Sequence, residues 1–566
     1  MVYRLNILIR NFFSKDWFCL TLVFLVVVAF IAPIPYMGIP DGDQDFPQHL
    51  QFAATYSDAI SARDFLSVWA ASDNYGFGSV GVRFYPPFAA FSLGFIKILT
   101  GNWFDAIWTS LLFWMFAGCA GIYFWSREWL APQYAMVGAA LYVIIPYHLL
   151  QIYQMWLYAE FVAAAILPFC FWFITRICRQ GRPIDVLLFA VSFSLLLLSH
   201  IPTTITGSLS LAVYGLLLVD WRQYRKTLVK LFVAFGLSLS ATAFYWVKVV
   251  TEIDWVKAND SQYSTGSYDP QNNLFPLLLS TGEKYITRGL WHFDVTFILT
   301  ILFFLFAIIY LGWQIKIIER QEWKNYLALS ITGLFAAFMM SLPSSFIWQS
   351  ISILQKIQFP WRWLSVLSII SVVIFASVIP LITSQTKIIK KLLAYTILFI
   401  VCSILLFDVT QSIIQSEPVP RTAFETKLPE MFGEPGCECW WTTWAKKQAF
   451  ERREKVSAES RNVKVTMWEA TEREFTIEAG EPANMRVATF FYPYWQAQVN
   501  GQTVQIQKDD DGSILIPVAG EKSSVKLYFQ EPKFLKIASV LSLFTWLLML
   551  GLLIPAYRNK KSNALS

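Results

Sequence analysis

The chain has 566 residues, of which 56% are hydrophobic, 17% aromatic and 15% charged, with a net charge of +6. Ordinary soluble domains carry about 25% charged residues. Stretches of about 20 apolar residues, each long enough to cross a bilayer, recur along most of the sequence. We therefore expect a polytopic α-helical membrane protein in contact with the lipid bilayer. The modest positive charge lies mostly in short loops, so it reports orientation and not nucleic-acid binding.

The first apolar segment, Trp17–Tyr36, is too long and too poor in small residues at its end for a cleaved signal peptide. It leads into a polar loop at 38–85 that begins DGDQDFPQHL, and this loop carries Asp43, Asp45 and His49. Asp45 and His49 are four residues apart and would share one face of a helix that starts near Phe46. A carboxylate beside a histidine is the arrangement that a general base needs. Helix capping by Asp45 and binding of a divalent cation by the aspartates are the alternatives.

Four apolar runs follow, at about 86–101, 104–125, 133–148 and 158–176, although an odd number of crossings is needed to reach the basic loop at Arg176. The short first run, which starts after Tyr85, and the break at Pro146 are the most plausible irregularities. Glu160 lies just inside a span edge, where a buried carboxylate is costly and usually functional, and simple solvation of an interfacial carboxylate is the alternative. His148 lies at a helix end with no evident partner, so its role is open.

Basic short loops alternate with the remaining apolar runs, and this pattern predicts about twelve transmembrane helices with both ends in the cytoplasm. His200 then lies at the outer end of a span, in SHIPTT, where a tight polar turn is the alternative reading. Arg362 lies between two tryptophans in QFPWRWL. Its planar guanidinium is suited to clamp a phosphate, and contact with lipid headgroups is the alternative. An outer loop at 248–293 contains Lys248 and His292.

The segment 409–533 is richer in charge and shows strand-like alternation, with Asn500-Gly501 as a hairpin turn. We expect a small extracytoplasmic β-sandwich-like domain there, between a transmembrane domain at 1–408 and a closing helix with a cytoplasmic tail at 534–566. Cys437 and Cys439 lie in this region, and their spacing is expected to be too short for an unstrained disulfide. No nucleotide-binding or metalloprotease motif occurs in a credible context, so any activation must come with the substrate.

Several segments, in this order, resemble a bacterial family of multispan membrane proteins called 6-pyruvoyl-tetrahydropterin-synthase-related. The likeness covers most of the chain and rests on DFPQH, NYGFGSVGVRFYPP, LYVIIPYHLLQIY with AEFVAAAILP, and LLLLSHIPTT. The segments FYWVK, FPWRW and FYPYWQAQVNGQ add to it.

The resemblance implies the fold and chemistry of GT-C glycosyltransferases. It predicts transfer of a sugar from a polyprenyl-phosphate carrier to a glycan, lipid or protein acceptor, at a site on the extracytoplasmic face of the inner (plasma) membrane. Asp45 and His49 match the acidic first outer loop, with Asp43 as a competitor. No organic cofactor is implied, and a divalent cation is left open.

Within this interpretation Arg362 and Lys248 would hold the leaving phosphate. The other candidates are expected to bind substrate or cover the cavity: Tyr85, His148, Glu160, His200 and His292. A transporter or flippase of a lipid-linked glycan is the main alternative, although such proteins usually show internal repeats and charges at mid-membrane depth. A scaffold in an envelope complex is a third reading, which leaves the acidic loop without a role.

Overall fold

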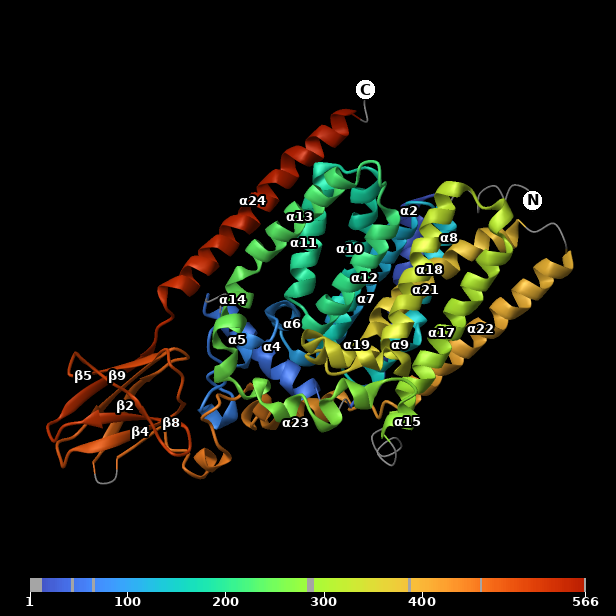
Figure 1. Cartoon of the computed structure of the whole chain (residues 1–566). Coiled ribbons are helices and arrows are strands. Elements are labelled where there is room, and N and C mark those ends of the chain that lie inside the picture. Colours follow the sequence, from blue (N-terminus) through green and yellow to red (C-terminus); the bar gives the residue numbers. More distant parts are fainter. Residues whose placement is uncertain are drawn as a thin grey trace.

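The computed structural model describes residues 13–41, 45–63, 67–281, 290–384, 388–458 and 461–563. Most of the described chain is helical, and a small pair of β-sheets follows the main helical bundle in sequence (Figure 1). The helices are α2 (Asp16–Ile31), α3 (Pro33–Met37), α4 (Phe46–Ser61), α5 (Gly81–Phe84), α6 (Pro87–Thr100), α7 (Trp103–Ser126), α8 (Pro132–Ile144), α9 (Pro146–Leu149), α10 (Tyr158–Arg179), α11 (Pro183–Leu197), α12 (Ile201–Leu218), α13 (Tyr224–Ala241), α14 (Ala243–Glu252), α15 (Leu277–Thr281), α17 (Trp291–Trp313), α18 (Arg320–Met340), α19 (Ser345–Ser350), α20 (Ser352–Gln355), α21 (Leu364–Thr383), α22 (Ile388–Ile414), α23 (Arg421–Gly433) and α24 (Lys533–Asn563).

Seven helical segments in the described part of the chain are long and apolar enough to cross a membrane: Asp16–Met37, Trp103–Ser126, Tyr158–Arg179, Ile201–Leu218, Trp291–Trp313, Pro360–Thr383 and Lys533–Ile554. Two bent pairs and three shorter apolar helices add further candidates. The structure therefore confirms a polytopic helical architecture, while the count of twelve crossings stays a prediction.

The predicted irregularity at Pro146 is present. The helices Pro132–Ile144 and Pro146–Gln154 form a pair bent by 40°. Ile145 is extended (φ −64°, ψ 134°), as expected for a residue before proline, and the proline lacks the N–H that would continue the helix. A π-helical turn at Leu150–Gln154 follows. The first short run is also irregular, since α6 has only 14 residues.

A second break lies among the remaining apolar runs, in the run at about 228–247, where the sequence shows no proline that would predict a break. There α13 and the segment from Ala243 are bent by 71°. The break is stabilised by α24: the backbone N–H of Phe244 donates to the Ser542 hydroxyl (2.9 Å), and the Trp546 indole donates to the Ala241 carbonyl (3.0 Å). Side chains of α24, about 300 residues later in the sequence, thus form hydrogen bonds with backbone groups that the helix break leaves without helical partners.

Within the residues that the structure describes, nine strands form two antiparallel sheets with the orders β1-β4-β8-β7 and β2-β3-β9-β5-β6. They are β1 (Val456–Ser457), β2 (Val463–Trp468), β3 (Glu472–Ile477), β4 (Ala483–Phe490), β5 (Trp495–Val499), β6 (Gln502–Val504), β7 (Gln507–Lys508), β8 (Ser513–Val518) and β9 (Ser523–Phe529). The predicted hairpin joins β5 to β6, with Asn500 and Gly501 at φ 51° and 80°. Both residues have the positive φ that a tight two-residue hairpin requires.

The β-domain shares its hydrophobic core with the first outer loop. Trp69, Phe77 and Phe84 from that loop are buried in the same cluster as Phe490 and Trp495, and the Phe490 N–H donates to the Phe77 carbonyl (2.9 Å). The sheets lie beside α5 and the start of α24, which runs from there to the opposite end of the bundle (Figure 1). The β-domain is therefore packed onto the segment that carries the predicted site.

Candidate polar active site

Asp45 occupies the N-cap position of α4, and its backbone carbonyl accepts the His49 N–H (3.0 Å). Its side chain makes no capping hydrogen bond and is exposed. The carboxylate is therefore not engaged in capping the helix. Asp43 lies outside the described residues. No group of three or more metal-binding side chains occurs in the described ranges.

His49 lies one turn into α4 and is buried. Its ring contacts the edges of Tyr85 (5.5 Å between centroids) and Tyr158 (6.1 Å). Burial lowers the pKa of His49, and the nearby Asp45 charge opposes this effect. The neutral imidazole, which can accept a proton, is favoured near neutral pH.

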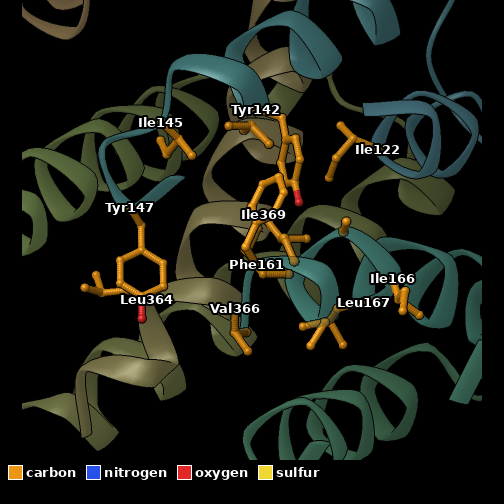
Figure 2. Packing of buried hydrophobic residues seen from close by; sticks show 14 of the residues in the cluster. Ile122, Tyr142, Ile145, Tyr147, Phe161, Ile166, Leu167, Leu364, Val366 and Ile369 are labelled. Carbon is orange, nitrogen blue, oxygen red and sulfur yellow. The ribbon is translucent and has the colours of Figure 1, made fainter. Parts of the chain in front are cut away.

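Glu160, on α10, is buried and paired with groups from two other elements. Its carboxylate accepts hydrogen bonds from the Tyr147 hydroxyl (2.5 Å) and the Ser365 hydroxyl (3.1 Å). The Arg362 guanidinium lies 3.6 Å away. Figure 2 shows the Tyr147 ring beside Leu364, within the apolar core that surrounds this carboxylate. A buried carboxylate with this many donors is fixed in position.

Arg362 comes from the short helix Pro360–Trp363 at the start of α21. One guanidinium nitrogen donates to the Ile357 carbonyl (2.5 Å), and the group lies over the Phe359 ring at 5.1 Å. Its side chain keeps 15% of its surface exposed. With only one carboxylate neighbour among the described residues, at 3.6 Å, the guanidinium retains donors for an incoming anion.

His200 caps α12, with Nδ1 2.8 Å from the Thr203 hydroxyl. The pKa of His200 is lowered by burial and further by the charges of Arg362 and His49. Burial and the charges of Asp45 and Glu160 raise the pKa of Tyr85, whereas the charge of Arg362 lowers it. The contacts described above and these electrostatic interactions connect six residues that we call the polar cluster: Asp45, His49, Tyr85, Glu160, His200 and Arg362.

Three predicted residues have other surroundings in the structure. His148 packs on Tyr142 (4.2 Å) with Nδ1 3.0 Å from the Gln151 amide oxygen, inside the helical core. His292 is stacked on Trp291 (3.6 Å). Lys248 forms an ion pair with Glu531 (2.9 Å). Lys248 was expected to help Arg362 hold the leaving phosphate, and the bend before α14 directs it to Glu531, just before α24.

A second group of charges was missed by sequence reasoning. Arg83 donates two hydrogen bonds to Glu252 (both 2.9 Å) and one to Glu531 (2.7 Å), and the Tyr492 hydroxyl donates to Glu252. We call Arg83, Lys248, Glu252, Tyr492 and Glu531 the junction network. It ties the first outer loop, α14, the β-domain and α24 together. No local pattern signals contacts between residues this far apart in sequence.

Cys437 and Cys439, whose spacing was expected to be too short for an unstrained disulfide, are joined in a disulfide in the structure. Their Cα atoms are 5.2 Å apart, within the range that disulfides span. The loop they close bonds to α4, since the Cys437 N–H donates to the Gln48 side chain (2.7 Å). The next residue, Trp440, contacts Tyr85 (5.5 Å). This loop therefore borders the polar cluster.

The outer segment after α14 lies against the chain that carries Arg362. The Gln358 side chain donates to the Tyr263 carbonyl (2.8 Å), and the Tyr268 ring lies 6.0 Å from the ring of Phe359. Short 3₁₀ turns between Ile253 and Asn273 make up this part. The remainder of the predicted cover, at 282–289, lies outside the described residues.

Together, the fold and the polar cluster define a multispan membrane protein with a polar site at the end of the helical bundle nearest its β-domain. A family model matches residues 82–415, with the description "6-pyruvoyl-tetrahydropterin synthase related domain; membrane protein". The chain belongs to this family, as the sequence motifs predicted.

No curated protein matches the chain. Among solved structures it is similar to the apo oligosaccharyltransferase of Archaeoglobus fulgidus, with 11% identity and a TM-score of 0.45. That match covers 75% of this chain and 61% of the other, so the chain spans less than two thirds of that protein.

Proposed function

We propose that this protein is a membrane glycosyltransferase that moves a sugar from a polyprenyl-phosphate carrier to an acceptor on the extracytoplasmic side of the plasma membrane. The observation that carries the proposal is the polar cluster itself. An uncapped carboxylate and a neutral histidine, both on α4, are linked electrostatically through Tyr85 and His200 to an arginine with free donors before α21. A scaffold has no need of such an arrangement.

The reaction assigns a role to each group. Asp45, supported by His49, accepts the proton of the acceptor hydroxyl as the acceptor oxygen bonds to the anomeric carbon. The bond between this carbon and the phosphate oxygen breaks, and polyprenyl phosphate leaves with the electron pair. Arg362 stabilises the negative charge that develops on this phosphate. Glu160 holds Arg362 in place, and Tyr85 and His200 bind sugar hydroxyls.

The surroundings fit a reaction that must exclude water. The segment around Tyr263 and Tyr268 lies over the chain that bears Arg362, and Trp440 covers Tyr85 from the other side. A covered site protects an activated donor from hydrolysis and strengthens the electrostatic interactions inside it.

Sugar transfer by purified protein tests the proposal. A panel of radiolabelled polyprenyl-phosphate sugars is offered to the wild type, to Asp45→Asn and to Asp41→Asn, a matched change at another exposed aspartate of the same loop. We expect transfer by the wild type and by Asp41→Asn, and loss of transfer in a folded Asp45→Asn. Full activity of Asp45→Asn would remove Asp45 from the mechanism. Movement of labelled lipid across reconstituted vesicles without transfer would favour a flippase instead.

A further inference from the structure

A cavity of about 340 Å³ lies beside the turn between α5 and α6. Its walls come from α6, α11, α14 and α24 and are mainly apolar: Phe88, Phe91, Leu195, Leu198, Phe244 and Trp546. This volume is at the lower end of the range for small-molecule sites. The cavity therefore suits a single hydrocarbon chain segment better than a bulky ligand.

One end of this cavity is cationic, because Arg83 and Lys248 also line it. Both side chains are buried, with 0% and 8% of their surfaces exposed. Arg83 donates three hydrogen bonds to Glu252 and Glu531. The ammonium of Lys248 has one carboxylate contact among the described residues, to the Glu531 oxygen that Arg83 also binds. An ammonium group has three donors, so Lys248 can bind a further anionic group.

The cavity lies at the membrane-facing side of the molecule. Only 22% of the hydrophobic window of α24 is buried, and Phe544 and Leu547 on this helix are 63% and 60% exposed. Side chains of this kind contact lipid in a membrane helix. Trp546, on the same helix, lines the cavity. A lipid chain can therefore enter from the bilayer beside α24.

The cavity and the polar cluster share a wall. Pro87 and Leu198 line the cavity, and each lies two residues from a cluster member, Tyr85 and His200 respectively. The Phe88 N–H donates to the Leu198 carbonyl (2.7 Å) and so holds these two segments together. Two residues of extended chain span roughly 7 Å, a distance that a lipid headgroup can bridge.

We propose that this cavity binds the acceptor, and that the acceptor is an anionic phospholipid whose headgroup carries a free hydroxyl. The lipid chain lies between α6 and α24, the phosphodiester contacts Lys248, and the hydroxyl reaches Asp45. Arg362 then binds the phosphate of the donor, and Lys248 binds the phosphate of the acceptor. This inference rests on the proposed function, because it names the second substrate of the same reaction. The transferred sugar becomes bonded to the headgroup oxygen, and the hydroxyl proton passes to Asp45.

Photo-crosslinking in nanodiscs tests the binding step without any need for transfer. Benzoylphenylalanine replaces Phe244 in the cavity or, as a matched control, Phe232 on the lipid-exposed face of α13. The nanodiscs contain phosphatidylcholine with a small fraction of phosphatidylglycerol. We expect position 244, but not position 232, to crosslink phosphatidylglycerol in excess of its abundance.

Two variants distinguish the contribution of the Lys248 charge from that of the cavity volume. Lys248→Gln should reduce this preference roughly fivefold, the effect of one lysine near an anionic headgroup. Phe91→Trp should reduce crosslinking by filling the cavity with its charges intact. Asp45→Asn should crosslink as the wild type does, because it changes only the proton acceptor. Thermal melting of each variant separates these effects from misfolding.

Other results would overturn the inference. Equal crosslinking of both lipids at position 244 would remove the anionic specificity. Displacement of phosphatidylglycerol by added polyprenyl phosphate would assign the cavity to the donor. Selective crosslinking with sugar transfer to a different acceptor would make the bound lipid a structural ligand. Selective crosslinking with no transfer from any donor would refute the proposed function and leave only a lipid site.

Discussion

Replacing Arg83 by methionine should destabilise the junction between the β-domain and the membrane helices. The side chains of Arg83 and Glu252 are both 0% exposed and joined by two hydrogen bonds of 2.9 Å. Removing one partner of a buried pair costs about 3–5 kcal/mol, because the other charge remains buried without compensation. Glu252 would keep the hydroxyl of Tyr492 as a partner but would lose its buried counter-charge. Since whole domains are stable by only about 5–15 kcal/mol, this loss should be large.

The assay is a thermal melt in detergent, combined with limited proteolysis of the exposed chain around Arg452 and Arg453. Arg83→Met should melt several degrees lower and be cleaved faster. The double variant Arg83→Met with Glu252→Gln removes both charges, and it should recover most of the lost stability, because no unpaired ion remains. A wild-type melting temperature for Arg83→Met, or a double variant as unstable as the sum of the two single variants, would refute this account of the junction.

Three further outcomes are expected. Because burial lowers the pKa of His49, stability should be lost as the pH falls from about 6.5 towards the lower folded-state pKa, and a melting curve of His49→Gln against pH should be flatter there. Cys437 and Cys439 should resist alkylation until a reductant is added, as mass spectrometry of the peptide would show. Arg362→Gln should lower kcat on the order of 10²-fold, and Arg362→Lys should retain part of the activity, since only the fork geometry is lost.

Much of the architecture could be predicted because its signals are local. Apolar runs predicted most of the helices, and Pro146 predicted the break between α8 and α9. Asn500-Gly501 predicted the hairpin between β5 and β6. The four-residue spacing of Asp45 and His49 placed them on one helix turn. Partners across long separations carry no such signal. The bend after α13 and the contact of Lys248 with Glu531 both depend on where distant segments pack.

The junction network explains why the β-domain belongs to the proposed catalytic unit. Arg83 lies two residues before Tyr85, so the pairing of Arg83 with Glu252 and Glu531 also fixes the backbone that presents Tyr85 to the polar cluster. Lys248 shares Glu531 with Arg83. A substrate anion that binds Lys248 would therefore change the balance of charge on the segment that holds Tyr85. The carboxylate of Glu531 therefore couples the polar cluster to the β-domain and to α24.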